Sequence, residues 1–276
     1  MSIEYINDLQ IRVKQPIDLS FLKQFGDVFW ILDTQSSGNL CFGVKNGNEK
    51  YFIKFAGAKT INDHDLPPED AVDRLKVARI KYKEMAHPVL TRLIDSMEIG
   101  NGYALIFEWA EGEKIGYNDF YISDRFYSMP IIKRIKAFEE ILHFHAHVAK
   151  CGYVAIDFNS NNVIYDYETE KVKICDIDFY ANQSYINGMG SIFGVKTLMS
   201  PEEYRCAGLI DEITNIYTMG ATAFLLLSYG ERSLEKWTLN EELFKVIKKA
   251  VNDKRKERQK SIEQLINEWN NAKEKQ

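Results

Sequence analysis

Hydrophobic and polar residues alternate through much of the first 110 residues, which is the pattern of β-strands buried on one face. In the segment 51–55, Tyr51, Ile53 and Phe55 share one face, and Phe52 and Lys54 lie on the other. Similar strands are predicted at 29–32, 40–44 and 103–107, with glycine-containing turns at 46–48 and 99–102. We therefore expect an antiparallel sheet in this part of the chain.

Two other segments show the helical period. Residues 130–150 are predicted to form an amphipathic helix, because apolar residues recur every three or four positions and Gly152 follows. These residues are Ile131, Ile135, Phe138, Leu142, Ala146 and Ala149. A second helix is expected over 68–85. The longest apolar run, 221–227, is too short to span a bilayer.

Polar side chains suited to phosphoryl transfer lie between residues 152 and 178. Asp157 and Asn162 are five residues apart in a polar loop with apolar segments on both sides. The segments 163–164 and 171–175 alternate as two short strands, and the second ends at Asp176. A hairpin of these strands would bring the loop and the strand end together. Asp157 could then orient a hydroxyl while Asn162 and Asp176 hold Mg²⁺.

This order of helix, loop, hairpin and aspartate resembles the protein kinase superfamily, and the likeness runs from about Phe29 to Trp269. The resemblance implies that Asp157 is the catalytic-loop aspartate and that Asn162 and Asp176 bind the metal ion. Three later segments also match in order: 199–202 closes the activation segment, 211–220 begins the central helix, and 257–262 carries the Arg258 expected to pair with Glu202.

The resemblance implies an ATP site on the predicted sheet. Lys54 is expected to contact the α- and β-phosphates, because a lysine in so apolar a strand indicates a specific role; an edge-strand charge is the alternative. Phe107 is expected to close the back of the adenine pocket. The backbone of Glu108, Trp109 and Ala110 is expected to form the hinge that binds adenine.

Two features of this half depart from the family. The loop expected to cover the phosphates has one glycine, Gly38, although the backbone amides of Ser36, Ser37 and Gly38 could still hold phosphate in a tight turn. An ordinary polar hairpin is the alternative. Ala78 stands where the family has the glutamate that pairs with the strand lysine, and Asp73 is a candidate replacement on the same helix although it is out of register.

Some residues favour a small-molecule acceptor of the phosphate and others favour a protein acceptor. Asn159 replaces a lysine two residues after the catalytic aspartate, and it is expected to donate a neutral hydrogen bond to the γ-phosphate. Asp178 replaces a glycine and resembles small-molecule kinases; it is expected to bind Mg²⁺, with a turn charge as the alternative. The nine residues 194–202 instead resemble protein kinases and favour a protein substrate.

Two further substitutions lie near the catalytic aspartate. Ile156 replaces the arginine that pairs with a phosphorylated activation segment, so we expect activity that does not depend on phosphate there. Asn215 replaces an aspartate and is expected to accept hydrogen bonds from the catalytic-loop backbone.

Composition supports one catalytic unit of two lobes. The chain has 276 residues, of which 45% are hydrophobic, and this is enough to bury a large core. A net charge of -5 argues against a nucleic-acid surface. The start of the chain does not have the pattern of a signal peptide, and the four cysteines are scattered. We expect a cytoplasmic protein without a membrane partner.

The expected fold is α+β: a two-lobed kinase-like fold with a small antiparallel-sheet N-lobe, one N-lobe helix and a larger, mainly helical C-lobe. Residues 1–28 are expected to pack on the N-lobe as an extension, 29–108 to form the N-lobe, and 109–276 to form the C-lobe. The expected activity is transfer of the γ-phosphate of ATP, with Mg²⁺, to a serine or threonine of a protein. The alternatives are a small-molecule kinase of the aminoglycoside or choline type and an ATP-binding pseudokinase scaffold.

Overall fold

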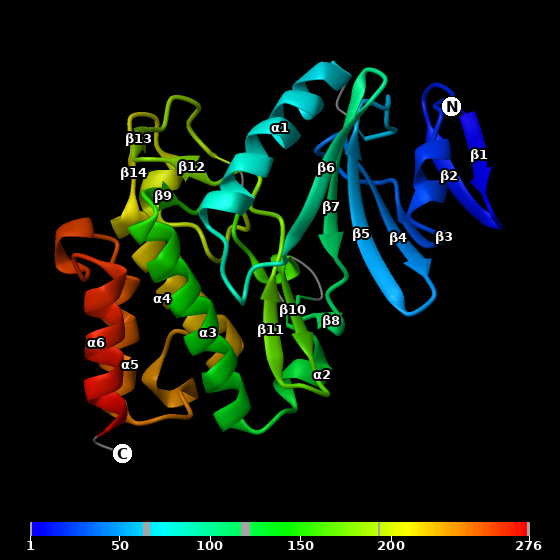
Figure 1. Cartoon of the computed structure of the whole chain (residues 1–276). Coiled ribbons are helices and arrows are strands. Elements are labelled where there is room, and N and C mark those ends of the chain that lie inside the picture. The colour runs from blue at the N-terminus through cyan, green and yellow to red at the C-terminus, as the bar shows by residue number, and fades with distance from the viewer. Residues whose placement is uncertain (1, 63–66, 117–121, 193, 275–276) are drawn as a thin grey trace. The chain divides into compact units, whose positions relative to one another are not determined.

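Residues 2–62, 67–116, 122–192 and 194–274 are described by the structure, which is a computed structural model (Figure 1). The chain divides into two units, Met1–Ala110 and Glu111–Gln276. Among the described residues, no helix has the length and apolar character needed to cross a membrane.

A five-stranded antiparallel sheet is the centre of the first unit. Its strands, in the spatial order β3-β4-β5-β7-β6, are β3 (Asp27–Leu32), β4 (Leu40–Asn46), β5 (Glu49–Ala56), β7 (Gly102–Glu108) and β6 (Leu93–Ile99). Helix α1 (Pro68–Glu84) connects β5 to β6 and packs against strands of this sheet (Figure 1). The strands and turns predicted from the alternating pattern are therefore present.

The two faces of this sheet have different neighbours. Ile53, Phe55, Phe42 and Ile106 lie on one face, in a buried apolar cluster. The N-terminal segment contributes to the same cluster through Ile11, Val13, Leu19 and Leu22. It consists of β1 (Ser2–Ile6), β2 (Leu9–Val13) and a short 3₁₀-helix (Ser20–Gln24). The N-terminal segment thus covers one face of the sheet, while α1 lies against the other, where its Tyr82 ring contacts Phe107.

The second unit is mainly helical. Its helices are α2 (Asp124–Tyr127), α3 (Ile131–Lys150), α4 (Glu212–Ser228), α5 (Glu241–Ala250) and α6 (Ile262–Lys273). Helix α4 is mostly apolar and is buried on all sides from Thr214 to Ser228, because α3, α5 and α6 all pack against it. The Asp211 side chain caps α4 by accepting hydrogen bonds from the amides of Ile213 and Thr214.

Short antiparallel strands, in one three-stranded and two two-stranded sheets, lie between these helices or before them. They comprise β8 (Glu113–Lys114), β9 (Tyr153–Val154), β10 (Val163–Asp166), β11 (Lys171–Ile174), β12 (Ala181–Asn182), β13 (Tyr185–Ile186) and β14 (Leu209–Ile210). The pair β10–β11 is the predicted hairpin after the polar loop. A sheet-rich first unit with one helix and a mainly helical second unit confirm the predicted α+β class.

Candidate active site

The polar loop between β9 and β10 holds Asp157 in an unusual backbone conformation. Its φ is 60°, in the left-handed region, which costs an L-residue about 1 to 2 kcal/mol. The Asn159 side chain stabilises this conformation by donating from Nδ2 to the Asp157 carbonyl oxygen (3.0 Å). Its Oδ1 accepts from the Asn161 amide (2.9 Å) and begins the 3₁₀-helix Ser160–Asn162. The Asn159 side chain therefore links the Asp157 backbone to the start of the 3₁₀-helix.

The hairpin that follows brings Asn162 beside Asp176. Val163 pairs with Ile174 in the β10–β11 register, so the residues on either side of the hairpin meet. The Asn162 carbonyl accepts from the Cys175 amide (2.9 Å), and its Nδ2 donates to the Asp176 carbonyl (3.2 Å). Asp176 also has a φ of 60°. An amide oxygen and a carboxylate, both of which suit Mg²⁺, are thus carried by adjoining segments.

Four residues after Asp176, the buried Tyr180 forms a hydrogen-bonded pair with the buried His145 of α3. The His145 Nδ1 lies 2.8 Å from the Ile141 carbonyl oxygen, so this nitrogen carries the proton and Nε2 accepts from the Tyr180 hydroxyl (3.1 Å). Burial raises the pKa of Tyr180 well above its usual range, and the carboxylates of Asp157 and Asp176 raise it further. Tyr180 therefore remains neutral and donates its hydroxyl proton to His145. Asp178 is also buried.

The start of the loop that carries Asp157 is held by Asn215 of helix α4. Its Oδ1 accepts from the Ala155 amide (2.7 Å), as predicted, and its Nδ2 donates to the Ala155 carbonyl (2.8 Å). All these groups are buried, so both polar atoms of one peptide segment are satisfied by one side chain. An aspartate could not make the second bond, since an ionised carboxylate only accepts.

The segment 199–202, which is expected to close the activation segment, is held by an ion-pair cluster around Glu202. Arg258 donates to the two Glu202 carboxylate oxygens at 2.7 and 2.9 Å, and the Arg258 side chain is fully buried. Arg255 adds a bond to Glu202 (2.6 Å) and two to Asp211 (both 2.7 Å). Burial alone would raise the pKa of Glu202, but Arg258 and Arg255 outweigh it and lower the pKa.

In the first unit, Lys54 lies on the sheet face that α1 covers. It pairs with Cys41 on β4 and Leu105 on β7, and only 4% of its surface is exposed. Phe52, two residues earlier, pairs with Gly43 and Phe107. An aromatic group continues this face. Its rings make successive contacts in the order Phe29, Trp109, Trp30, Phe52 and Phe107.

Gly43 makes room for this aromatic group. A Cβ atom at Gly43 would lie 2.8 Å from the Phe29 ring and 2.9 Å from the Trp109 ring. Both distances are shorter than non-bonded carbon atoms tolerate, so a larger residue would displace the rings.

The segment expected to be the hinge continues β7. Phe107 is buried between Phe52 and Tyr82. The Glu108 amide donates to the Arg92 carbonyl (3.0 Å) and the Trp109 amide donates to the Lys50 carbonyl (3.2 Å). These two backbone donors are therefore used within the unit.

The segment expected to cover phosphate forms a tight turn. The Gly38 amide donates to the Gln35 carbonyl (3.3 Å), and Gly38 has a φ of 76°, which glycine adopts without strain. The Ser37 hydroxyl accepts from Asn39 (3.0 Å), and the Ser37 carbonyl accepts from Arg74 on α1. The Gly38 amide is thus engaged inside the turn, which leaves the Ser36 and Ser37 amides as the expected phosphate contacts.

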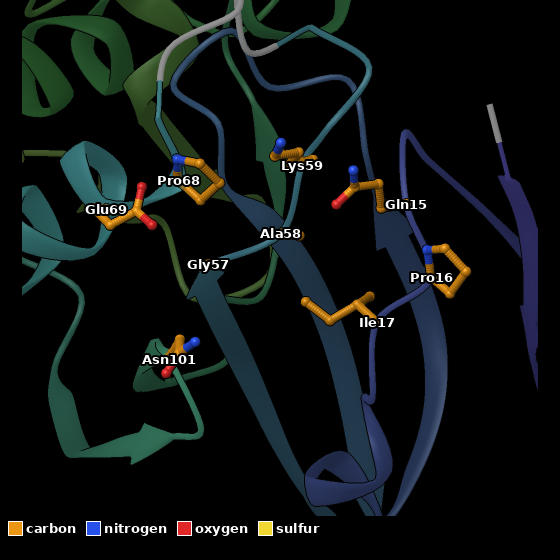
Figure 2. A pocket seen from close by; sticks show the side chains of 9 residues that line it. All are labelled: Gln15, Pro16, Ile17, Gly57, Ala58, Lys59, Pro68, Glu69 and Asn101. Carbon is orange, nitrogen blue, oxygen red and sulfur yellow. The ribbon is translucent and has the colours of Figure 1, made fainter.

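On α1, the buried face carries Ala78 and Tyr82, while Asp73 and Glu84 are exposed. The expectation that Asp73 occupies the inner face is wrong. Asp73 lies two residues before the buried Leu75, which is about 200° around the helix, and it is exposed on the solvent side. A pocket of about 150 Å³ opens elsewhere in this unit, and Figure 2 shows its lining: Gln15, Pro16, Ile17, Gly57, Ala58, Lys59, Pro68, Glu69 and Asn101. None of the predicted nucleotide-binding residues lines it.

In the parts of the chain that the structure describes, no three His, Cys, Asp or Glu side chains group together in a way that could hold a metal ion. A Mg²⁺ ion at this site would therefore use the amide of Asn162 with the Asp176 carboxylate, together with oxygens from a bound phosphate. This donor set fits the ion, because Mg²⁺ is commonly held by one or two carboxylates and by substrate phosphates.

Sequence reasoning missed several residues around these sites. Arg12, Arg74 and Arg255 all bind to predicted site segments, yet none of them belongs to a recognised motif. Tyr180 binds His145 on α3 and was not predicted either. Their contacts join residues that are far apart in the sequence, so only the folded structure reveals them.

Comparison with known protein families agrees with these features. A family model described as the protein kinase domain matches residues 37–275, which is most of the chain. The match includes Lys54, the polar loop, the β10–β11 hairpin and the Glu202–Arg258 pair, and it supports a phosphotransferase activity with ATP binding. The chain therefore belongs to the protein kinase domain family.

Proposed function

We propose that the protein is an ATP-dependent protein kinase that transfers the γ-phosphate to a serine or threonine hydroxyl. The observation that carries this proposal is the junction of Asn162 with Asp176, at the end of a loop that holds Asp157 in a left-handed conformation. Conformational strain that the surrounding structure maintains is typical of functional sites.

In the proposed mechanism, Asp157 accepts a hydrogen bond from the attacking hydroxyl and orients it towards the γ-phosphorus. Asn162 and Asp176 would hold Mg²⁺, which when bound neutralises charge on the phosphate oxygens. We propose that Asp178 supports the same ion. Asn159, whose Nδ2 already binds the Asp157 carbonyl, acts on the γ-phosphate only through its second N–H, so its larger contribution is to position Asp157.

The first unit would bind the nucleotide. We propose that Lys54 neutralises the α- and β-phosphates and that the Ser36 and Ser37 amides cover them, with Gly38 shaping the turn. The base would lie against the aromatic face that ends in Phe107 and Trp109. Because the amides of Glu108 and Trp109 bind within the unit, the hinge donor to adenine is assigned to Ala110.

A protein acceptor is supported by the closing part of the activation segment. Glu202 is fixed by two arginines, and removal of one partner from a buried pair typically costs about 3 to 5 kcal/mol. A segment held so firmly offers a stable surface for an extended peptide. Since ATP is the phosphate donor, we propose that the enzyme works in the cytoplasm.

The decisive experiment is incubation with γ-labelled ATP and Mg²⁺, alone and with a cell extract, followed by mass spectrometry of the labelled product. We expect phosphoserine or phosphothreonine on protein. Asp157→Asn and Asp176→Asn should each lower the rate by about a thousandfold or more, since each removes a group that acts on the transferring phosphate. Asp253→Asn, which changes an exposed carboxylate in the same unit, should retain the wild-type rate.

Other outcomes separate the alternatives. Label on a small molecule and never on protein would select a small-molecule kinase, which the buried carboxylate of Asp178 favours. A rise in melting temperature with ATP and Mg²⁺, without ATP consumption, would select a pseudokinase, which Ala78 and the single loop glycine favour. Undiminished transfer by Asp157→Asn would contradict the proposed mechanism.

A further inference from the structure

The N-terminal hairpin, β1 and β2, lies outside the matched family region, which begins at Ser37. It nevertheless contacts the segment that leads into the phosphate-covering turn. The Arg12 amide donates to Asp33 Oδ2 (2.8 Å), its Nε donates to the same oxygen (3.0 Å), and its Nη2 donates to Asp33 Oδ1 (2.8 Å). Three bonds to one carboxylate form a bidentate pair strengthened by the backbone.

Asp33 is a buried carboxylate close in sequence to the proposed phosphate contacts, where a negative charge would repel the phosphates. It is 7% exposed and stands three residues before Ser36, where the proposed function puts the polyphosphate. Burial alone would raise its pKa, but the hydrogen bonds and charge of Arg12 outweigh this and lower the pKa. Without Arg12, a buried negative charge next to the phosphates would be left uncompensated.

The same segment is held at two further points. Asn62 Nδ2 donates to the Thr34 carbonyl (3.0 Å), and Arg74 on α1 donates to the Ser37 carbonyl. Side chains from the hairpin, from the segment after β5 and from α1 therefore fix consecutive parts of residues 33–38. With one glycine, this segment has little freedom to adapt when a nucleotide arrives, so its affinity depends on being held in the binding shape beforehand.

We propose that the N-terminal hairpin is part of the nucleotide site, and that Arg12 is a positioning residue which acts through Asp33 on the phosphate-covering turn. The inference rests on the proposed binding of ATP. In this inference, an element outside the family match holds the turn in its nucleotide-binding conformation, because the turn does not do so by itself.

The test compares Arg12→Ala, Asp33→Asn and the double variant by calorimetric titration with Mg·ATP and by steady-state kinetics. Arg12→Ala should raise the Kd and the KM for ATP about tenfold and leave kcat unchanged. A purely structural role would instead reduce the active fraction, and hence the apparent kcat, without changing KM. The double variant should bind ATP more tightly than Arg12→Ala, because Asp33→Asn removes the uncompensated charge.

Two controls match these changes. Lys76→Ala breaks an ion pair with Glu98 (3.0 Å) in the same unit, and Gln15→Ala changes an exposed residue just after the hairpin that lines the pocket in Figure 2. Both should bind ATP as the wild type does. Wild-type affinity in Arg12→Ala would overturn the inference, and a double variant that binds ATP more weakly than Asp33→Asn would show that Arg12 does not act through Asp33.

A second measurement keeps this inference separate from the proposed function. Amide hydrogen exchange of residues 33–38 without nucleotide should be faster in Arg12→Ala than in the wild type and in Lys76→Ala. If the wild type binds no ATP, the proposed function fails. Unchanged exchange in Arg12→Ala would overturn the positioning role whether or not ATP binds.

Discussion

At the scale of single residues, two buried titratable groups of the second unit have opposite effects on stability. Burial raises the pKa of Glu203 from its usual 4.5 to about 7, although hydrogen bonds from Ser200 oppose the shift. Between these values the folded chain keeps a proton that the unfolded chain loses, so this contribution falls as pH rises. Burial lowers the pKa of His145 from 6.5 to about 4, so its contribution falls as pH decreases through that range.

We predict that Glu203→Gln and His145→Gln change the pH dependence of the unfolding free energy in opposite directions. Each contribution amounts to about 3 kcal/mol over its range. Urea denaturation from pH 4.5 to 6.5 would measure the slope of the unfolding free energy against pH. We expect this slope to be more positive than in the wild type for Glu203→Gln and more negative for His145→Gln. Glu235→Gln, at an exposed position, should leave the slope unchanged. Equal slopes in the wild type and Glu203→Gln would contradict the assigned burial effect.

At the scale of elements, α4 and the catalytic loop are joined by the two hydrogen bonds between Asn215 and Ala155. The family residue at this position is aspartate, yet an aspartate here would face the Ala155 carbonyl with a second acceptor. The local arrangement therefore depends on the amide, and the neighbouring Ala155 and Ile156 are buried with it.

We predict that Asn215→Asp, although it restores the family residue, destabilises the protein by about 2 kcal/mol and lowers phosphoryl transfer. The loss arises because a buried carbonyl is left without its donor and meets a negative charge. Chemical denaturation and the transfer assay would measure both effects. Asn270→Asp adds the same charge on the exposed side of α6 and should change neither. A variant as stable and active as the wild type would refute this role for the amide.

The ion-pair cluster around Glu202 was predicted only in part. The pairing of Glu202 with Arg258 was expected from their family positions, and the structure contains it at 2.7 Å. The bonds of Arg255 to Glu202 and Asp211 were not expected. Arg255 lies in a run of charged residues that has the sequence pattern of an ordinary solvated surface.

At the scale of the whole molecule, the N-terminal segment is an integral part of the first unit. Ile11, Val13, Leu19 and Leu22 are at most 8% exposed and share the apolar cluster of the sheet. Burial of each such side chain contributes about 1.5 to 3 kcal/mol, so together they contribute about as much as the stability of a whole domain.

Deletion of residues 2–25 should therefore expose the outer face of the sheet, including Phe42 and Phe55. We predict that the truncated protein binds a hydrophobic dye, aggregates on warming and loses the cooperative unfolding of the first unit. Dye fluorescence and calorimetry would measure these effects. Tyr5→Ser, at a hairpin position that is 69% exposed, should behave as the wild type. Wild-type unfolding without dye binding would show that the sheet does not need this cover.

The sequence by itself determined the fold class and several of the longer elements, and it predicted the hairpin that follows the polar loop. Alternation and helical period are local properties of the chain, and they marked β5, β7 and α3 to within a few residues. That Asn162 and Asp176 lie on adjoining segments could be predicted because they are 14 residues apart and a short hairpin connects them. Local patterns of this kind do not depend on the rest of the molecule.

Only the tertiary structure decided which distant side chains support these segments. Arg12 meets Asp33, 21 residues away, and His145 meets Tyr180, 35 residues away. It also decided that Asp73 faces solvent and that the Gly38 amide is used within its own turn. Such contacts follow from the packing of whole elements, and one polar residue without a periodic or motif context gives no signal of the partner it will meet.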